Sequence, residues 1–404
     1  MLDLLRDRGV PIHRQHFSWT ELAHSPISKL DADAFTRIRV IVMSALEAEA
    51  VKFDHAVARM YPRLHRHLAV IRRIEHYQQT LVSGLMSPDH TPLETTIAVE
   101  QAEVEITAAI ARYEPDPDVA AVYRFGLLED VDHLYRFAAL MDRLWGQDAN
   151  TILQSYTDIV PGRPTALDHR HPLDDLRHHY DHRRADLQTR LGALTLTALQ
   201  QHARDYYMSI APTFGDPVAR QLFAEIASTE EQHLTQYESV IDPREGLLEK
   251  WLLHEASEAF NYWSCCEQED DPKVRAIWER MLDYELGHVH VVAEIFEDIE
   301  RRDAAEVLHR IIDAPLDHRS QRDMIRSVLR TEVGLSAREQ ELVPRADETI
   351  RTREQRARLD RDDSPSNVVA AGYVWGPGTE LASAHPDERV ERRQRISPLA
   401  RSEQ

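Results

Sequence analysis

The chain has 404 residues, more than one small hydrophobic core can organise, so two domains with extensions are expected. Its 48 basic and 69 acidic residues give a formal net charge of −21, which disfavours nucleic acid and anionic membranes as partners. The only cysteines are the neighbours Cys265 and Cys266, which excludes a disulfide framework, and no apolar run reaches membrane-spanning length. The charged N-terminus also lacks a signal-peptide pattern, so a cytoplasmic protein is expected.

Helical periodicity begins near residue 34, after an N-terminal arm of residues 1–33, and continues to about residue 335. Three Asp-Pro steps, which begin at Asp116, Asp216 and Asp271, each precede an apolar-periodic run. An acceptor side chain followed by proline is typical of a helix start. With only 13 glycines in the chain, these signals predict an all-α fold.

Two Glu-x-x-His motifs are the main chemical signal. Glu230 and His233 form the first motif, and Glu285 and His288 form the second one 55 residues later. Residues three apart share a helix face, so each motif directs a carboxylate and an imidazole the same way. Paired motifs of this kind are typical of dinuclear metal sites in four-helix bundles.

The chain also repeats. The shift of 55 aligns Tyr207 with Tyr262, and it makes residues 195–242 and 250–297 two copies of one helix pair. A shift of 155 carries the pattern to the N-terminal half, where the counterparts of the ligand-type residues are Glu75, Gln78, Glu100, Glu103, Asp130 and His133. A shift of 153 adds Glu47 as the counterpart of Gln200.

Four helix pairs predict two tandem four-helix bundles. The expected boundaries are a degenerate bundle at 34–154, a His-rich linker at 155–184, a bundle with a dimetal site at 185–315, and a helical, then extended or disordered, tail at 316–404. The tail is expected to dock through Tyr373 and Trp375.

The acidic residues lie on apolar helix faces, which is the physical reason to expect a metal. Glu285 and His288 continue a stripe that contains Trp278, Met281 and Val292. Ionised carboxylates buried in such a core are costly unless they are paired or bind a cation. A single core histidine would instead be a hydrogen-bonded packing residue. Carboxylates with imidazoles and no thiolate suit iron or manganese, and this ligand set does not separate the two metals. Iron is expected because open positions on a carboxylate-bridged pair of Fe(II) ions favour dioxygen or peroxide chemistry.

Four segments resemble the ligand helices of the rubrerythrin-like branch of the ferritin-like superfamily. They are QQHARDYYMSIA, FAEIASTEEQHLTQYES, HEASEAFNYW and IWERMLDYELGHVHVV, within about residues 186–300. The resemblance implies two iron ions in the C-terminal bundle, with Tyr207 and Tyr262 as outer hydrogen-bond donors. The implied ligands are Glu230, His233, Glu255, Glu258, Glu285 and His288, with Gln200 as a weak one in place of the family's first glutamate.

The N-terminal half departs from this pattern at Gln78 and Asp130, so it is predicted to be a degenerate structural copy. A second metal site is the alternative, and its ligands would be Glu47, Glu75, Glu100, Glu103, Asp130 and His133.

The function that follows is a non-haem dimetal oxidoreductase reacting with peroxide or dioxygen. The chain has no Cys-x-x-Cys motif, so an external electron donor is expected. The alternatives are a non-catalytic iron-binding or iron-sequestering protein and a ferritin-like scaffold without turnover. The sequence leaves the substrate open, and it is compatible with a homo-oligomer.

Overall fold

The structure is a computed structural model that describes residues 1–154, 156–157, 159, 162–165, 169–309 and 311–376. Apart from one antiparallel hairpin, the regular elements of these residues are helices, which confirms the predicted all-α fold. Within the same ranges, no helix combines the length and the apolar composition needed to cross a membrane.

The helices differ strongly in length. The long ones are α2 (Ala34–Met60), α3 (His65–Ser83), α4 (Pro92–Tyr113), α5 (Pro117–Trp145), α7 (Leu187–Ile210), α8 (Pro217–Val240), α9 (Leu247–Gln268) and α10 (Pro272–Glu300). The shorter elements are α1 (Trp19–Leu22), α6 (Asn150–Leu153), α11 (Arg322–Glu332), α12 (Ile350–Leu359), α13 (Pro365–Ala370) and the paired strands β1 (Leu335–Arg338) and β2 (Glu341–Pro344).

The three Asp-Pro steps begin helices as predicted. The side chain of Asp116 accepts from two backbone N–H groups of the first turn of α5, and Asp271 does the same for α10. Asp216 caps α8 by accepting from the backbone N–H of Ala219. Each cap satisfies donors that have no partner within the helix, and the proline that follows fits the first turn.

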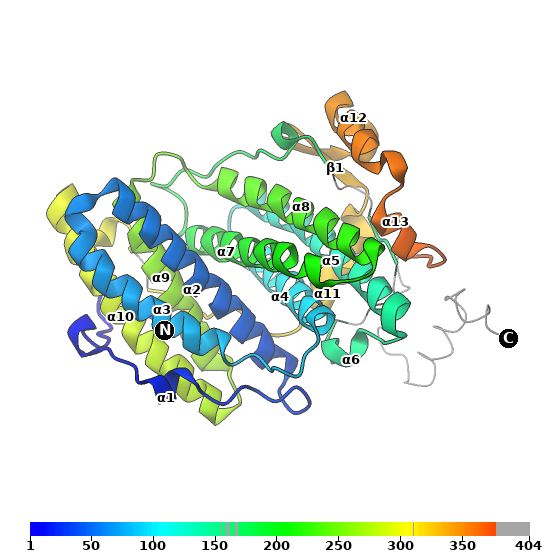
Figure 1. The fold of residues 1–404 in the computed structure, drawn as a ribbon. Helices are drawn as coiled ribbons and strands as arrows, with labels where there is room; N and C mark the ends of the chain where they lie inside the picture. The colour runs from blue at the N-terminus through cyan, green and yellow to red at the C-terminus, as the bar shows by residue number, and fades with distance from the viewer. Residues whose placement is uncertain (155, 158, 160–161, 166–168, 310, 377–404) are drawn as a thin grey trace.

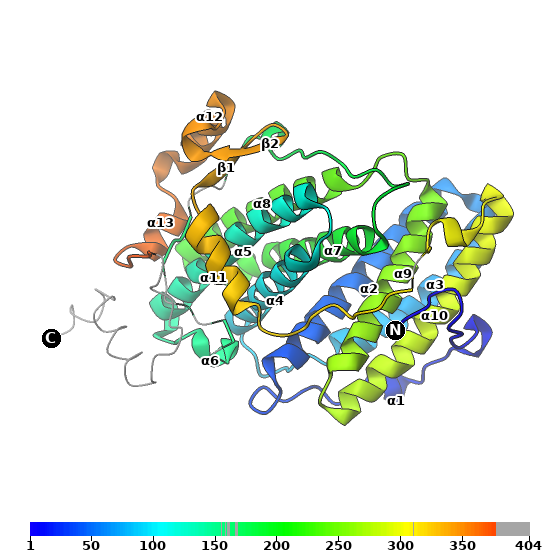
Figure 2. The ribbon, with the colours of Figure 1, turned by 180° about the vertical axis from the view of Figure 1, so that it is seen from behind.

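The long helices of the described chain form two groups that lie side by side (Figure 1, Figure 2). We call α2, α3, α9 and α10 bundle A, and α4, α5, α7 and α8 bundle B. In bundle A, α2 packs on α3 and α9, and α9 packs on α10. In bundle B, α4 packs on α5 and α7, and α8 packs on α5 and α7.

The tandem order expected from the sequence is therefore wrong. Each bundle combines one helix pair from the first half of the chain with one pair from the second half. The exchange resembles domain swapping, in which equivalent elements trade places at little cost. Because the pairs are near copies, their apolar faces do not specify which two pairs combine.

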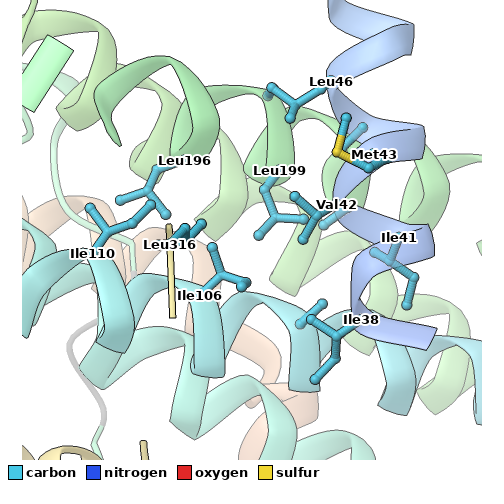
Figure 3. Close-up of a cluster of buried hydrophobic side chains, with 14 of the residues drawn as sticks. Ile38, Ile41, Val42, Met43, Leu46, Ile106, Ile110, Leu196, Leu199 and Leu316 are labelled. Carbon is cyan, nitrogen blue, oxygen red and sulfur yellow. The ribbon is translucent and has the colours of Figure 1, made fainter. Parts of the chain in front are cut away.

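A continuous apolar core joins the bundles. Residues Ala34–Glu47 of α2 are buried on all sides, because this helix also packs against α7 and α4 of bundle B. Figure 3 shows side chains from the three helices gathered there, among them Val42, Leu199 and Ile106. The two bundles thus share one core.

The N-terminal arm lies along bundle A. Leu2 forms an isolated antiparallel bridge with Ile312, and the backbone N–H of Val10 donates to the carbonyl of Asp283 on α10. The contact is close, since a β-carbon on Gly287 would lie 2.1 Å from the carbonyl oxygen of Val10. Glycine is therefore required where the arm crosses α10.

Part of the predicted His-rich linker is buried, although several of its described residues are exposed. Arg170 and Asp174 are 1% and 0% exposed, and Pro172–Asp174 forms a 3-10 turn. Asp174 accepts hydrogen bonds from Thr352 and Arg351 on α12, which explains why this polar segment is buried.

The C-terminal segment is also folded further than predicted. Up to residue 376 it forms β2, α12 and α13, and α13 packs on α8 and α5. Ser364 and Ser366 donate to the buried Glu225, and Tyr373 donates to Asp142 at 2.5 Å. Val369 belongs to the apolar core, and Tyr373 and Trp375 pack against it. Tyr373 and Trp375 thus pack on the core as expected from the sequence. The last part of the predicted tail, residues 377–404, lies outside the described residues.

Candidate metal centres

Bundle A encloses a group of acidic side chains that we call centre A. Every one of its four helices contributes at least one residue, and all of them are at most 2% exposed. The members are Glu47 on α2, Glu75 and Gln78 on α3, Glu255 and Glu258 on α9, and Glu285 and His288 on α10.

Centre A is held together by contacts across the bundle. Gln78 Nε2 donates to Glu285 Oε1 at 2.5 Å and to Glu47 Oε1 at 3.3 Å. His288 Nδ1 lies 3.2 Å from Glu285 Oε2 and 3.6 Å from Glu255 Oε2. Ligand atoms of Glu75, Glu255 and His288 all lie within 4.8 Å of one another, so a single ion can contact the three.

Asp54 is a member of centre A that the sequence analysis missed. It is 1% exposed, and its Oδ2 has no hydrogen-bond partner. Asp54 follows Glu47 by seven residues, so both side chains share one face of α2, and this spacing was the available signal.

Bundle B encloses the equivalent centre B. Its members are Glu100 and Glu103 on α4, Asp130 and His133 on α5, Gln200 on α7, and Glu230 and His233 on α8. All of them are 0% exposed.

The two imidazoles of centre B lie against its carboxylates. His133 Nδ1 is 2.7 Å from Glu230 Oε1, yet neither atom makes a hydrogen bond, so the short distance lacks hydrogen-bond geometry. His233 Nδ1 is 3.2 Å from both Asp130 Oδ1 and Glu230 Oε2. The rings of His133 and His233 stack with centroids 5.6 Å apart. Such convergence of acceptor atoms is typical of ligands around a shared cation.

The sequence prediction of one C-terminal site is corrected by this arrangement. Glu255, Glu258, Glu285 and His288 do lie together, but Glu230 and His233 belong to the other bundle. The expected second set divides in the same way: Glu47 and Glu75 join centre A, and Glu100, Glu103, Asp130 and His133 join centre B. The cause is the exchanged helix pairs, so the contrast between a complete and a degenerate bundle does not apply.

The two glutamines that replace expected ligands, Gln200 and Gln78, each lie in one of the centres. Gln200 lies in centre B, where its Oε1 is 2.9 Å from His233 Nδ1 and its Nε2 donates to Asp130. Gln78 occupies centre A. Each centre therefore has one amide among its carboxylates, and Asp130 is the shorter acid in centre B.

The two tyrosines singled out in the sequence each donate to a glutamate. Tyr207 OH donates to Glu100 Oε1 at 2.7 Å in centre B, and Tyr262 OH donates to Glu47 Oε1 in centre A. These bonds orient the two carboxylates.

Burial dominates the electrostatics of both centres. It raises the pKa of Glu75 and Glu258 in centre A and of Glu103 in centre B well above the ordinary value, and repulsion between the carboxylates adds to the effect. Burial also opposes ionisation of Glu230, but the adjacent His133 and His233 outweigh it and lower that pKa to about 2. Carboxylates that resist ionisation in this way bind a proton or a metal cation.

Many of these buried oxygens have no donor. Both carboxylate oxygens of Glu103 and both of Glu258 lack a hydrogen-bond partner, as do single oxygens of Glu47, Glu75, Glu100 and Glu255. An unsatisfied buried acceptor costs about 1–3 kcal/mol. The concentration of such oxygens in the two centres therefore calls for a ligand. Divalent cations suit the oxygen and imidazole donors present.

Comparison of the chain with models of known protein families, with curated proteins and with solved structures found no match.

Proposed function

We propose that each bundle holds a pair of metal ions and that the protein is a non-haem dimetal oxidoreductase, similar to the rubrerythrin-like proteins. Iron is the proposed metal, and manganese is the alternative. The single observation that carries the proposal is the orientation of the imidazoles of His233 and His288, whose Nδ1 atoms face carboxylate oxygens while their Nε2 atoms bind other residues.

His233 makes the point most clearly. Its Nε2 is 3.1 Å from Glu129 Oε2, and the bound Arg170 keeps Glu129 ionised by lowering its pKa to about 2 against the effect of burial. A carboxylate only accepts hydrogen bonds, so Nε2 of His233 carries the proton. Its Nδ1 then faces the acceptors of Asp130, Glu230 and Gln200. In the metal-free protein burial lowers the pKa of His233, but the surrounding carboxylates outweigh it, raise that pKa and favour the doubly protonated ring. A bound cation would take the place of the Nδ1 proton.

The arrangement supports a cation for the whole group rather than a proton for one ring. A second proton on His233 leaves both oxygens of Glu103 and one of Glu100 unsatisfied in the same centre. A pair of divalent ions satisfies these oxygens and the imidazoles together.

A bound iron pair would supply redox equivalents and Lewis acidity for the reduction of peroxide or the activation of dioxygen. The chain's own residues hold the carboxylates in place, with Tyr207 and Tyr262 as donors to Glu100 and Glu47. Both centres lie among buried side chains, which limits access of water. Because the chain has no Cys-x-x-Cys motif, the electrons come from an external donor.

Iron binding without turnover is the second candidate. The net charge of −21 favours the collection of cations, and it serves a sequestering protein as well as an enzyme. Rapid consumption of peroxide or dioxygen by the Fe(II) form, sustained by an added reductant, distinguishes the enzyme from the binder.

Metal analysis tests the proposal. After anaerobic loading with Fe(II), the protein should hold about four ions per chain, two in each bundle. Glu285→Ala should remove the pair in centre A, and Glu230→Ala should remove the pair in centre B. The exposed neighbours Glu294 and Glu231 provide the controls Glu294→Ala and Glu231→Ala, which should keep all the metal. A wild-type protein that binds no metal overturns the proposal.

A further inference from the structure

Two polar residues outside the bundles are linked to one imidazole in each centre, Gln15 directly and Arg170 through Glu129. Gln15 belongs to the N-terminal arm, and Arg170 belongs to the segment between α6 and α7. They are separated by 155 residues, which is the repeat distance of the helices. Val10 and Thr165, at the same separation, also correspond: one donates to Asp283 on α10 and the other to Asp132 on α5.

Gln15 is fixed in one orientation in centre A. Its Nε2 donates to the carbonyl oxygens of Val10 and Tyr284, at 2.9 Å each, so its Oε1 must be the atom that faces His288. The distance from Oε1 to His288 Nε2 is 2.8 Å. Gln15 is 6% exposed, so water does not replace this acceptor easily.

Arg170 acts in centre B through a carboxylate. Its guanidinium binds both oxygens of Glu129, and its Nε donates to Asp175 at 2.6 Å. Glu129 Oε2 then accepts from His233 Nε2 at 3.1 Å. Arg170 and Glu129 are at most 1% exposed.

We propose that Gln15 and the Glu129–Arg170 pair are positioning residues, which orient the metal-binding imidazoles of His288 and His233; the inference rests on the proposed function. A hydrogen bond at the outer ring nitrogen fixes both the tautomer and the ring plane, and so directs the lone pair of Nδ1 into the centre. Each of these two imidazoles therefore depends on a residue outside its own helix.

The two arrangements differ chemically. The acceptor at Nε2 of the imidazole is a neutral amide in centre A and a carboxylate in centre B. The two imidazoles belong to helices that are not equivalent in the repeat of 155 residues. His288 is on α10, whereas His233 is on α8. At the shift of 155 residues the counterpart of His288 is His133, whose Nε2 has no hydrogen-bond partner. Each positioning residue should thus affect one centre alone.

The test isolates one centre at a time. In the Glu230→Ala background only centre A binds metal, and in the Glu285→Ala background only centre B does. Affinity for Co(II) is measured by competition with a chelator, and the visible absorption of bound Co(II) reports on its coordination. Gln15→Ala should weaken binding about 10- to 100-fold in centre A and leave centre B unchanged. Glu129→Gln should do the reverse.

A second variant guards against a general effect of losing a buried side chain. A β-carbon on Gly9 would lie 2.1 Å from the carbonyl oxygen of Asp283, so Gly9→Ala should lift the arm and reproduce the effect of Gln15→Ala on centre A. The thermal midpoint of the metal-free protein identifies variants that are merely destabilised.

The outcomes are distinct. Metal binding that Gln15→Ala and Glu129→Gln leave unchanged, in affinity and in Co(II) spectrum, overturns the positioning role while the metal centres stand. Equal weakening of both centres by one variant also overturns it. A wild-type protein that binds no metal overturns the centres and the positioning role together.

Discussion

Replacing Glu103 by methionine should stabilise the metal-free protein and at the same time remove metal from centre B. Glu103 is 0% exposed, and neither of its carboxylate oxygens has a hydrogen-bond partner. Burial raises its pKa, so in the absence of metal the carboxyl group keeps a proton. A thioether of similar volume avoids the cost of burying this acid without partners.

The magnitude follows from the unsatisfied oxygens. Each costs about 1–3 kcal/mol, and the retained proton reduces that cost, so the substitution should raise the free energy of unfolding by about 1–3 kcal/mol. In the presence of metal, Glu103→Met should instead lower the free energy of unfolding relative to the wild type. The variant loses a ligand, and with it the stabilisation that bound metal gives to the folded state.

Glu105 provides a matched control on the same helix. It is 1% exposed, but its oxygens accept from Thr157 at 2.5 Å and from the backbone N–H of Gln321 at 2.6 Å. Glu105→Met leaves these donors unpaired and should lower the free energy of unfolding by about 1–3 kcal/mol. Urea denaturation of both variants, with and without metal, measures the difference. Equal destabilisation of the metal-free protein by the two substitutions would refute the reasoning.

Three further predictions concern pH and single side chains. Burial raises the pKa of Asp54 to about 7 and also raises the pKa of its glutamate neighbours. An acid with a raised folded pKa stabilises below its unfolded pKa and loses this contribution as the pH rises through the folded value, so the metal-free protein should lose stability from about pH 4 to about pH 7. Gln78→His should tighten metal binding in centre A, measured by chelator competition, because imidazole is a stronger ligand than an amide. Tyr262→Phe should lower the free energy of unfolding by about 0.5–1.5 kcal/mol through loss of its bond to Glu47, without removing metal.

Each of these has a control and a contrary outcome. Loading with metal should abolish the loss of stability towards neutral pH, and a metal-free protein that gains stability over this range contradicts the assignment of protonated carboxyls. Centre B is the internal reference for Gln78→His, which is wrong if both centres change. Loss of bound metal in Tyr262→Phe would mean that the tyrosine does more than hold a carboxylate.

Local chemistry explains why much of the site was predictable. Helix starts depend on neighbours in the sequence, as at Asp116 and Asp271, and the burial of Glu285 with His288 follows from their place in an apolar stripe. The residues of the two centres were therefore identified almost completely before the structure. The sequence analysis missed Asp54 because it belongs to no repeated motif, although its spacing from Glu47 places both residues on the same helix face.

The residues that support the imidazoles were beyond sequence reasoning. Gln15 lies 273 positions from His288, and Arg170 reaches His233 only through Glu129. Such contacts depend on where a chain segment crosses a helix, and no periodicity encodes that crossing. The polar contacts from Ser364 and Ser366 to Glu225 have the same character, whereas the packing of Tyr373 and Trp375 on the core was expected from the sequence.

The sequence by itself determined the helical class, the helix starts at the Asp-Pro steps, the repeat and most side chains that face the interior, because these follow from short-range sterics and from the burial of apolar faces. Only the tertiary structure decided which helix pairs share a core. Four nearly equivalent pairs offer similar apolar faces, so the choice between tandem and exchanged pairing falls to connections and to helices such as α2, which is buried against both bundles. That choice separates Glu230 from Glu285 and turns one expected centre into two.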